Sequence, residues 1–279
     1  MADVVYLTTE QLHTLQSIEL ELLQEADRIC RKCGIHYNII AGTLLGAVRH
    51  GGFIPWDDDA DIALLREEYE KFREACKTEL NHDKYYFQDH TNTPGYRWGY
   101  GKLRKKGTIF LRQNQEHMPY EQGVFIDVFP LDYVSDKQWV RTVQNFHCFC
   151  VRKVFWSEVG RVAEKNFWKR KIYALESKIP LKAIQKYYEK MIRNNNRKRT
   201  EWVRILMFPT PNKAYGYRTE WYEESSEISF EGIKFIGIKD YENYLTFKFG
   251  DYRTLPPEGQ RKVHPVTRLK LGEEKECPK

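Results

Sequence analysis

Apolar residues recur every three or four positions near the start of the chain, which predicts a long helix with one apolar face. Thr8 and Gln11 stand at the spacing of a capping box that opens a helix, and Gly34 stands where a left-handed cap would close it. The apolar positions between these caps are Leu12, Leu15, Ile18, Leu22, Ala26 and Ile29. The chain therefore begins with a helix that runs from Thr8 to Gly34.

Beyond this helix, short strand-like runs alternate with helical patterns. Apolar runs predict strands over residues 36–41, 61–65, 85–88, 98–103, 108–112, 123–130, 203–208 and 235–238. Helical spacing predicts helices over residues 44–48, 67–80, most of 135–194 with a break near Pro180, and 240–249. The turn at residues 105–107 indicates that strand 108–112 pairs with strand 98–103.

Four aspartates crowd the end of the stretch GTLLGAVRHGGFIPWDDDAD, residues 42–61. Asp59 and Asp61 are two positions apart and lead into an apolar strand, so their side chains point the same way. Asp57 joins them if the strand starts early. Carboxylates held this close repel one another and raise each other's pKa unless a cation lies between them, and Mg²⁺ is the usual choice. The alternative is an acidic surface turn after Pro55.

Asp127 lies inside the apolar strand 123–130, where a lone carboxylate is costly to bury. It is therefore either an acceptor for buried amides or the third member of the carboxylate cluster. We favour the cluster, which makes Asp59, Asp61 and Asp127 the candidate catalytic and metal-binding residues, with Asp57 as a further candidate ligand.

Residues around the aspartates are suited to binding phosphate. Gly42 and Thr43 form a turn that opens a short helix, and free N–H groups at a helix N-terminus bind phosphate well. Arg49, Lys102 and Arg104 are cations that could contact the same phosphates. A metal held by the aspartates can bridge phosphate oxygens, so the residues indicate a phosphoryl-type transfer site.

Charge is unevenly distributed along the 279 residues. The net charge is +6, yet residues 152–200 carry fifteen Lys and Arg against four Glu, a net +11 that leaves −5 for the rest. Such a segment suits binding of a polyanionic substrate, an anionic membrane surface or nucleic acid. The alternative is that these charges only form the solvated face of a helix.

The N-terminus, the apolar runs and the cysteines indicate where the protein resides rather than what it does. No run of eighteen apolar residues predicts a transmembrane helix, and the N-terminus lacks the pattern of a secretory signal, so we expect a cytoplasmic protein. Cys30 and Cys33 form a C-x-x-C pair without a second pair. They are interpreted as reduced thiols, with a zinc site as the alternative.

The 42–61 stretch resembles the signature of the LicD family, which includes the fukutin-related phosphotransferases. The resemblance extends to Lys102-Leu-Arg104 with Thr108, to Gly123–Asp132, and to Tyr244-Leu followed by Gly250–Pro257. Arg253 departs from the family, whose members often carry Met there. Together these blocks run from about residue 35 to 265.

This resemblance implies an α+β fold with a nucleotidyltransferase-like mixed β-sheet core flanked by helices. We expect one domain over 1–279, made of a core (1–134), an added basic helical segment (135–200) and a C-terminal part that completes the domain (201–279). Matched position by position, Gly42 and Thr43 correspond to the family's turn, Asp59 and Asp61 to its metal-binding pair, and Asp127 to its third carboxylate.

The resemblance also implies a reaction. Similar bacterial proteins move phosphocholine from CDP-choline to a sugar hydroxyl of a glycan, teichoic acid or lipopolysaccharide precursor and release CMP, with Mg²⁺ or Mn²⁺ as cofactor. The expected partners are thus a CDP-activated alcohol and a glycan acceptor, for which a lipid-linked form at the inner face of the cell membrane is one candidate. Segment 152–200 would then contact the anionic membrane.

A choline head group requires an aromatic cage, because ring faces bind quaternary ammonium ions. Trp56, Trp98 and Tyr100, with Tyr96 nearby, lie close in sequence to the aspartates and are the candidates. Packing in the core is the alternative for each of them.

Three other functions fit parts of the sequence. A nucleotidyltransferase would attach NMP to a small molecule or protein, and a glycosyltransferase also uses D-x-D with a metal, although the Gly-Thr turn and Asp127 argue against it. A nucleic-acid-binding protein would use the basic segment, but no matching signature is present, so we expect no nucleic acid partner. A P-loop is excluded because Leu103 follows Gly99-Tyr-Gly-Lys102 where Ser or Thr is needed.

Overall fold

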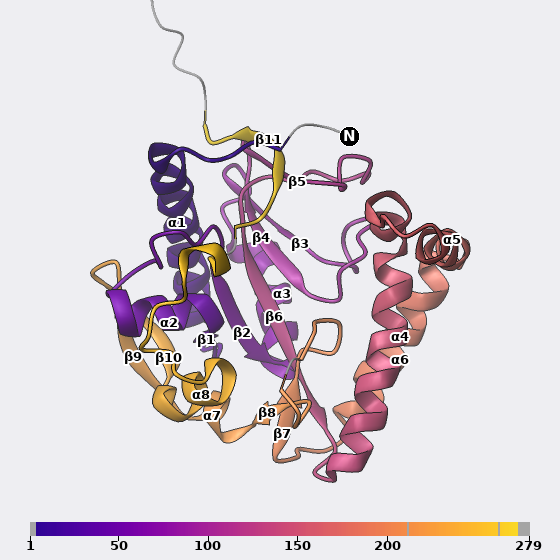
Figure 1. Cartoon of the computed structure of the whole chain (residues 1–279). Helices are drawn as coiled ribbons and strands as arrows, with labels where there is room; N and C mark the ends of the chain where they lie inside the picture. Colours follow the sequence, from indigo (N-terminus) through magenta and orange to yellow (C-terminus); the bar gives the residue numbers. More distant parts are fainter. Residues whose placement is uncertain (1–3, 211, 262, 273–279) are drawn as a thin grey trace, which may run out of the picture.

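The computed structural model describes residues 4–210, 212–261 and 263–272 (Figure 1). Helix α1 (Thr9–Cys33) begins and ends as the sequence predicts. The Thr8 hydroxyl accepts the backbone N–H of Gln11, the Gln11 side chain accepts that of Thr8, and Gly34 closes the helix at φ 64°. The buried face of α1 includes Leu15, Leu22, Ala26 and Ile29, so its apolar positions are those of the sequence pattern.

Nine strands of the described chain form one mixed sheet. Along its main path the order is β3 (Tyr85–Gln88), β4 (Gly101–Lys105), β6 (Phe125–Val134), β2 (Asp61–Leu65), β1 (Asn38–Ile39), β10 (Ile233–Ile238) and β9 (Ser225–Phe230). Strand β7 (Trp202–Arg204) pairs with β6, and β8 (Tyr217–Arg218) pairs with β7. The pairs β2–β6 and β1–β10 are parallel, and the other pairs are antiparallel. The predicted α+β class with a mixed sheet is confirmed.

A two-stranded sheet lies apart from the main one. Strand β5 (Ile109–Arg112) pairs with β11 (Val266–Lys270) near the end of the described chain, and Val5 forms a bridge with Val266. The predicted pairing of residues 108–112 with 98–103 is therefore wrong. Both edges of β4 are already occupied, by β3 and β6, so no edge of β4 is free to receive β5.

Helices cover the sheet and extend beyond it. Helices α1 and α3 (Arg66–Glu79) contact each other, and each also packs on strands of the main sheet. Helix α2 (Ala41–His50) connects β1 to the aspartate segment and contacts α8 (Tyr241–Phe249), while the short α7 (Glu220–Glu223) and a 3₁₀ turn (Glu258–Gln260) lie in the C-terminal part. These helices enclose the main core, in which Tyr37, Phe72 and Phe235 are almost fully buried.

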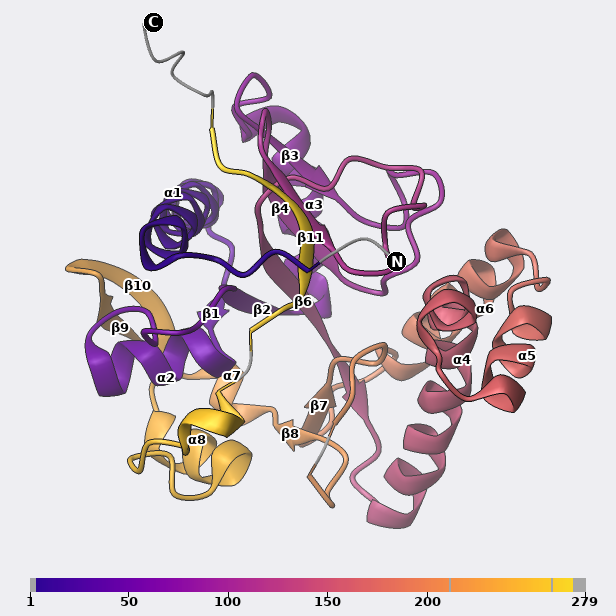
Figure 2. The ribbon, with the colours of Figure 1, turned by 45° about the horizontal axis from the view of Figure 1, so that its top comes forward.

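The basic segment is helical with a break at Pro180, as the sequence predicts, but a second break at residues 164–166, which was not predicted, divides it into three helices. Helices α4 (Gln138–Ala163), α5 (Phe167–Glu176) and α6 (Leu181–Asn195) lie together on one side of the molecule, away from α1 and α2, in both ribbon views (Figure 2). A small second core of Phe155, Tyr188 and Met207 packs α4 and α6 against the loop after β7. No helix within the described ranges combines the length and hydropathy that crossing a bilayer requires.

Candidate active site

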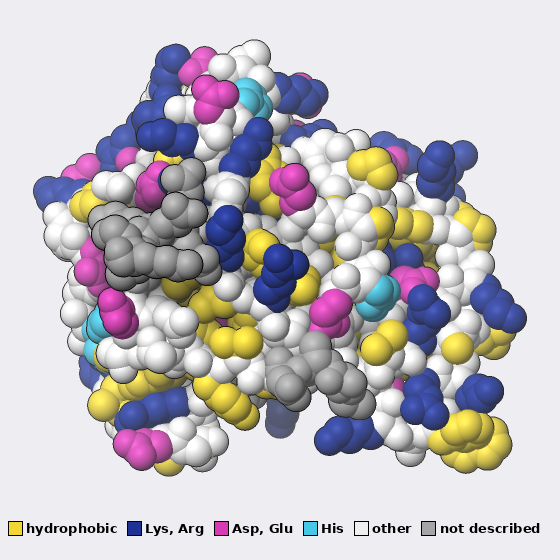
Figure 3. Space-filling view, turned by 90° about the horizontal axis from the view of Figure 1, so that it is seen from above, with side chains coloured by type: hydrophobic (Ala, Val, Ile, Leu, Met, Phe, Trp, Pro, Cys, Tyr) yellow, Lys and Arg dark blue, Asp and Glu magenta, His cyan; other side chains and the backbone are white. Residues whose placement is uncertain are grey.

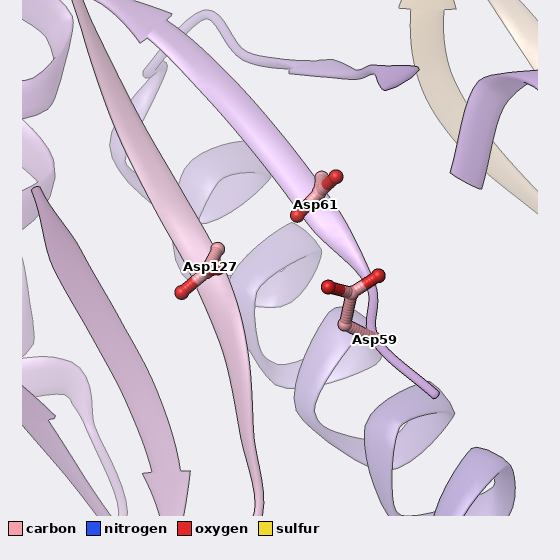
Figure 4. Close-up of side chains that lie close together, drawn as sticks. All are labelled: Asp59, Asp61 and Asp127. Carbon is pink, nitrogen blue, oxygen red and sulfur yellow. The ribbon is translucent and has the colours of Figure 1, made fainter. Parts of the chain in front are cut away.

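Three carboxylates converge at the junction of β2 and β6. Asp61 opens β2 and is the register partner of Asp127 on β6, and Asp59 comes from the segment just before β2 (Figure 4). Each residue offers an oxygen atom, and these atoms lie within 4.8 Å of one another. The structure thus brings together the three aspartates that the sequence singled out.

The electrostatics of this cluster favour binding a cation. Burial raises the pKa of Asp61 well above its usual range, with further contributions from Asp59 and Asp127. Burial likewise raises the pKa of Asp59, and it raises that of Asp57 to about 8, helped by the charges of Asp59 and Asp58. Oxygen-only donors of like charge are the set that a hard divalent cation takes up. The described residues therefore fit Mg²⁺ or Mn²⁺ at Asp59, Asp61 and Asp127.

Gly42 and Thr43 lie in the first turn of α2, where they position the aspartates. The Thr43 hydroxyl accepts the backbone N–H of Asp61 at 2.8 Å, and this link fixes where β2 begins. A Cβ atom at Gly42 would lie 2.6 Å from a carboxylate oxygen of Asp57, so a larger residue here would push that carboxylate aside. Ala41, at the N-terminus of α2, lines the cavity that contains the triad, and this helix end can face a phosphate there.

Lys102 and Arg104 lie side by side on β4 but are already engaged. Lys102 is the register partner of Asp127, and its ammonium group forms an ion pair with that carboxylate. Burial lowers the pKa of Lys102 to about 7. Arg104 donates to the Gln88 side chain at 2.7 Å and to the carbonyl oxygen of Gly123 at 2.6 Å. Lys102 therefore reaches the cluster directly, while Arg104 lies one step away.

Arg49 lies at the C-terminal end of α2, the opposite end from the triad. Its guanidinium donates to the carbonyl oxygen of Tyr252 at 2.8 Å. It does not line the cavity at the triad. The structure does not bring Arg49 to the cluster, and its contact with phosphate stays a prediction.

Three basic residues that the sequence reasoning missed do reach the cluster. Arg112 of β5 places a guanidinium nitrogen 3.8 Å from Asp59, and that nitrogen has no hydrogen-bond partner. His264, just before β11, lies 2.9 Å from Asp58 and 3.6 Å from Asp59. Both owe their position to the β5–β11 pair, so no local sequence signal could have found them.

The third missed residue is Lys248 of α8. It lines the cavity at the triad, and its ammonium group contacts the Tyr217 hydroxyl at 3.4 Å. The nearby hydroxyls of Tyr244 and Tyr217 and the carboxylate of Asp61 raise the pKa of Lys248 although burial opposes them. The sequence offered only the Tyr244-to-Pro257 block as a hint.

Three adjoining cavities provide room for a substrate. The cavity at the triad is small, about 100 Å³, and shares Tyr100, Arg112 and Phe208 with a larger one of about 430 Å³. A third, of about 180 Å³, shares Tyr100, Arg112 and His264 with the triad cavity. Arg112 and Tyr100 thus stand where all three cavities meet.

The three predicted cage residues fall into two places. Trp98 and Tyr100 line the two larger cavities, and the Trp98 ring lies 5.6 Å from that of Trp156 between centroids. Trp56 lines none of the three, and the Arg261 guanidinium already covers its ring at 4.3 Å. Tyr96 is fully buried. Trp98 and Tyr100 are thus the cage candidates that a ligand can reach.

The cysteine pair does not join a metal cluster. Cys30 is buried and Cys33 is exposed, both with free thiols. Among the described residues, the group whose ligand atoms converge is the aspartate triad. The interpretation of Cys30 and Cys33 as reduced thiols is consistent with this placement.

The sequence is similar to one family model and to two named transferases. Residues 34–162 match the model of the LicD/FKTN/FKRP nucleotidyltransferase domain. The chain is 25% identical over 266 residues to the lipopolysaccharide cholinephosphotransferase LicD of Haemophilus influenzae, covering 91% of this chain and 96% of that protein. A stretch of 53 residues is 40% identical to the human ribitol 5-phosphate transferase FKRP, covering 18% of this chain and 11% of that protein.

Proposed function

Because the chain belongs to the LicD/FKTN/FKRP family of transferases, we propose that it moves a phospho-alcohol from a CDP-activated donor to a hydroxyl group of a glycan and releases CMP. Phosphocholine from CDP-choline is the first candidate for the transferred group. The relative that aligns over nearly its whole length is named for cholinephosphate transfer to lipopolysaccharide. A cell-surface glycan precursor, carried by a lipid, is the corresponding acceptor.

The observation that carries this proposal is the convergence of Asp59, Asp61 and Asp127 beside two cavities large enough to hold parts of a substrate. These three carboxylates would hold Mg²⁺ or Mn²⁺, with Asp57 as a further candidate. When bound, the metal neutralises charge on the phosphates and polarises the reacting phosphorus.

The chain's own residues then divide the remaining tasks. Arg112, Lys248 and the N-terminus of α2 face the triad cavity and bind phosphate oxygens there. Lys102 holds Asp127 in place through their ion pair. Trp98 and Tyr100 offer ring faces to a quaternary ammonium group.

The bond changes are those of an in-line displacement. The acceptor oxygen forms a bond to the β-phosphorus of the donor, and the bond from that phosphorus to the CMP oxygen breaks. The proton of the acceptor hydroxyl passes to a carboxylate; Asp127 is the candidate base in the alternative arrangement in which Asp59 and Asp61 hold the metal without it. Positioning and electrostatics supply the rate enhancement in this scheme, without a covalent enzyme intermediate.

The decisive experiment incubates purified protein with Mg²⁺, candidate glycans and CDP-choline, CDP-ethanolamine, CDP-glycerol or CDP-ribitol. CMP release and the mass of the acceptor are measured, with EDTA and Asp59→Asn as controls. A phospho-alcohol on the acceptor supports the proposal. A nucleotide on the acceptor would show an NMP transferase instead.

A role in nucleic-acid binding would give a different result. Binding to DNA or RNA would weaken steeply with salt and would be unchanged in Asp59→Asn. Such binding without transferase activity would contradict the proposal.

A further inference from the structure

Helix α5 carries a stripe of apolar side chains that no other part of the described chain covers. Trp168, Ile172 and Leu175 follow one another at helical spacing, so they share one face, and 75%, 56% and 67% of them is exposed. Ile179, just after the helix, continues the same stripe. Large apolar side chains gathered in this way on a surface mark a contact with something else.

The opposite side of α5 is fixed to the rest of the molecule. Tyr173 is buried, and its ring lies against Gly160 of α4, where a Cβ atom would come within 2.6 Å of it. The Asn166 side chain caps the helix by accepting the backbone N–H of Lys169 at 3.1 Å. The stripe therefore sits on a rigid helix whose orientation is set by its packing.

Lysines surround this stripe. The exposed cations beside it are Lys165, Lys169, Arg170, Lys171 and Lys178. In the described part of the chain, the ion pairs of segment 152–200 are confined to Arg161, Arg193 and Arg199. Figure 3 shows hydrophobic and basic side chains interleaved at the side of the molecule that holds α4–α6. The charge around the stripe is thus available to an anionic partner.

The residue composition of this surface favours a lipid bilayer over another protein as its partner. Interfaces between proteins are depleted in lysine, whereas helices that lie on membranes combine Trp, Phe and Leu on one face with Lys and Arg beside it. We propose that α5 docks the protein on an anionic lipid bilayer, with Trp168, Ile172 and Leu175 inserted among the acyl chains and the lysines at the head groups.

Docking through α5 would bring a lipid-linked acceptor close to the active-site cavities. This step of the inference rests on the proposed function. Lys153 of α4 lines the 430 Å³ cavity, and its ammonium group contacts the Tyr173 hydroxyl of α5. The wall of the cavity on this side is therefore formed by a helix that packs directly on α5. A lipid-linked acceptor could thus reach the cavity while its lipid stays in the bilayer.

Vesicle flotation tests the inference without requiring turnover. The purified chain should float with vesicles that mix phosphatidylglycerol and phosphatidylcholine, and stay behind with phosphatidylcholine alone. The triple variant Trp168→Ser, Ile172→Ser, Leu175→Ser should bind at least tenfold more weakly. The variant Lys169→Gln, Lys171→Gln, Lys178→Gln should bind about a hundredfold more weakly, at about fivefold per cation near the surface.

The matched control carries Trp139→Ser and Phe146→Ser, which remove exposed aromatic side chains from the first half of α4. It should float like the unaltered protein. Equal binding of the α5 variants and the unaltered protein, or an equal loss in the α4 control, would overturn the inference.

Two further measurements distinguish membrane docking from dimer formation, and failure of the docking inference from failure of the proposed function. A dimer that the α5 apolar variant turns into a monomer, together with no vesicle binding, would show that a second copy covers the stripe. The α5 variants should retain CMP release with a water-soluble acceptor. Vesicle binding by a chain that releases no CMP would therefore contradict the proposed function and leave the docking inference standing.

Discussion

Asp61 and Asp127 are register partners on two adjacent parallel strands, so their carboxylates leave the sheet on the same face. On the opposite edge of β6, Lys102 of β4 is the register partner of Asp127. Three charged side chains therefore lie in one row across β4, β6 and β2. The row is set by backbone pairing rather than by flexible loops. Charge changes within it should therefore alter metal binding and turnover while the fold remains.

Asp61→Asn and Asp127→Asn should each lower kcat about a thousandfold, because a metal contributes several kcal/mol to the transition state. Mg²⁺ should raise the Tm of the unaltered protein, by mass action, but not that of either variant. Steady-state kinetics and thermal scans with and without Mg²⁺ check this. Near-normal turnover in both variants would refute the assignment of the metal site.

Asp57 should make the metal-free protein less stable as pH rises. Its pKa is about 3.9 in an unfolded chain and about 8 in the folded one, where burial and the charges of Asp59 and Asp58 favour the protonated form. Between these values the folded chain holds a proton that the unfolded chain has lost. The stability that this proton provides is present below about pH 4 and is lost as pH rises through about 8.

Thermal scans in EDTA from about pH 6 to about pH 9 cover the range in which the folded protein loses this proton. As pH rises, the Tm of Asp57→Asn should fall less steeply than that of the unaltered protein. Adding Mg²⁺ should make the Tm of the unaltered protein depend less on pH. Identical slopes for the two proteins in EDTA would contradict the raised pKa of Asp57.

Arg112→Ala should reduce kcat/KM about a hundredfold, which is the usual scale for removing one donor from a reacting oxyanion. Arg112→Lys should recover only part of this, since lysine keeps the charge and lacks the planar fork. Arg49→Ala is the matched comparison, because that guanidinium binds the Tyr252 carbonyl at the far end of α2. A larger loss from Arg49→Ala would reverse the two roles.

Lys102→Ala should raise the KM of the donor or lower kcat by about ten- to a hundredfold, the range for a hydrogen bond to a charged group. The physical reason is that Asp127 loses the cation that holds it. Initial rates over a range of donor concentrations separate the two effects. If neither parameter changes, Lys102 has no part in the site.

Trp98→Ala should raise the KM of CDP-choline about five- to thirtyfold, in line with cation–π energies. CDP-ribitol, which lacks a quaternary ammonium group, should be affected less. Trp56→Ala should behave like the unaltered protein, because Arg261 already occupies its ring face. A stronger effect at Trp56 than at Trp98 would point to a cage elsewhere.

The parts of the site that local patterns encode were predictable. Asp59 and Asp61 stand two apart before an apolar strand, and Asp127 is conspicuous inside another, so alternation and burial cost sufficed to find them. The fold class followed from a family signature that spans the same residues. Elements with strong periodicity, such as α1 and β2, lie where the pattern placed them.

The parts that depend on distant pairing were not predictable. Arg112 reaches Asp59 only because β5 leaves the main sheet to pair with β11, some 150 residues later. Strand β9 (Ser225–Phe230) was missed because its sequence, SSEISF, is largely polar. Contacts of this kind are decided by which sheet edges are free, and that depends on the whole fold.

The pairing of β5 with β11 also sets the order in which the enzyme can be made. Arg112 is synthesised early, but its partner strand and His264 emerge from the ribosome among the last residues described. A nascent chain can pair β2 with β6 well before then, yet the side of the cavity that Arg112 and His264 form beside Asp59 must wait for β11. The β2–β6 part of the site can thus form before the part that depends on β11, so a chain ending before His264 should still pair Asp61 with Asp127 but lack the histidine beside Asp59.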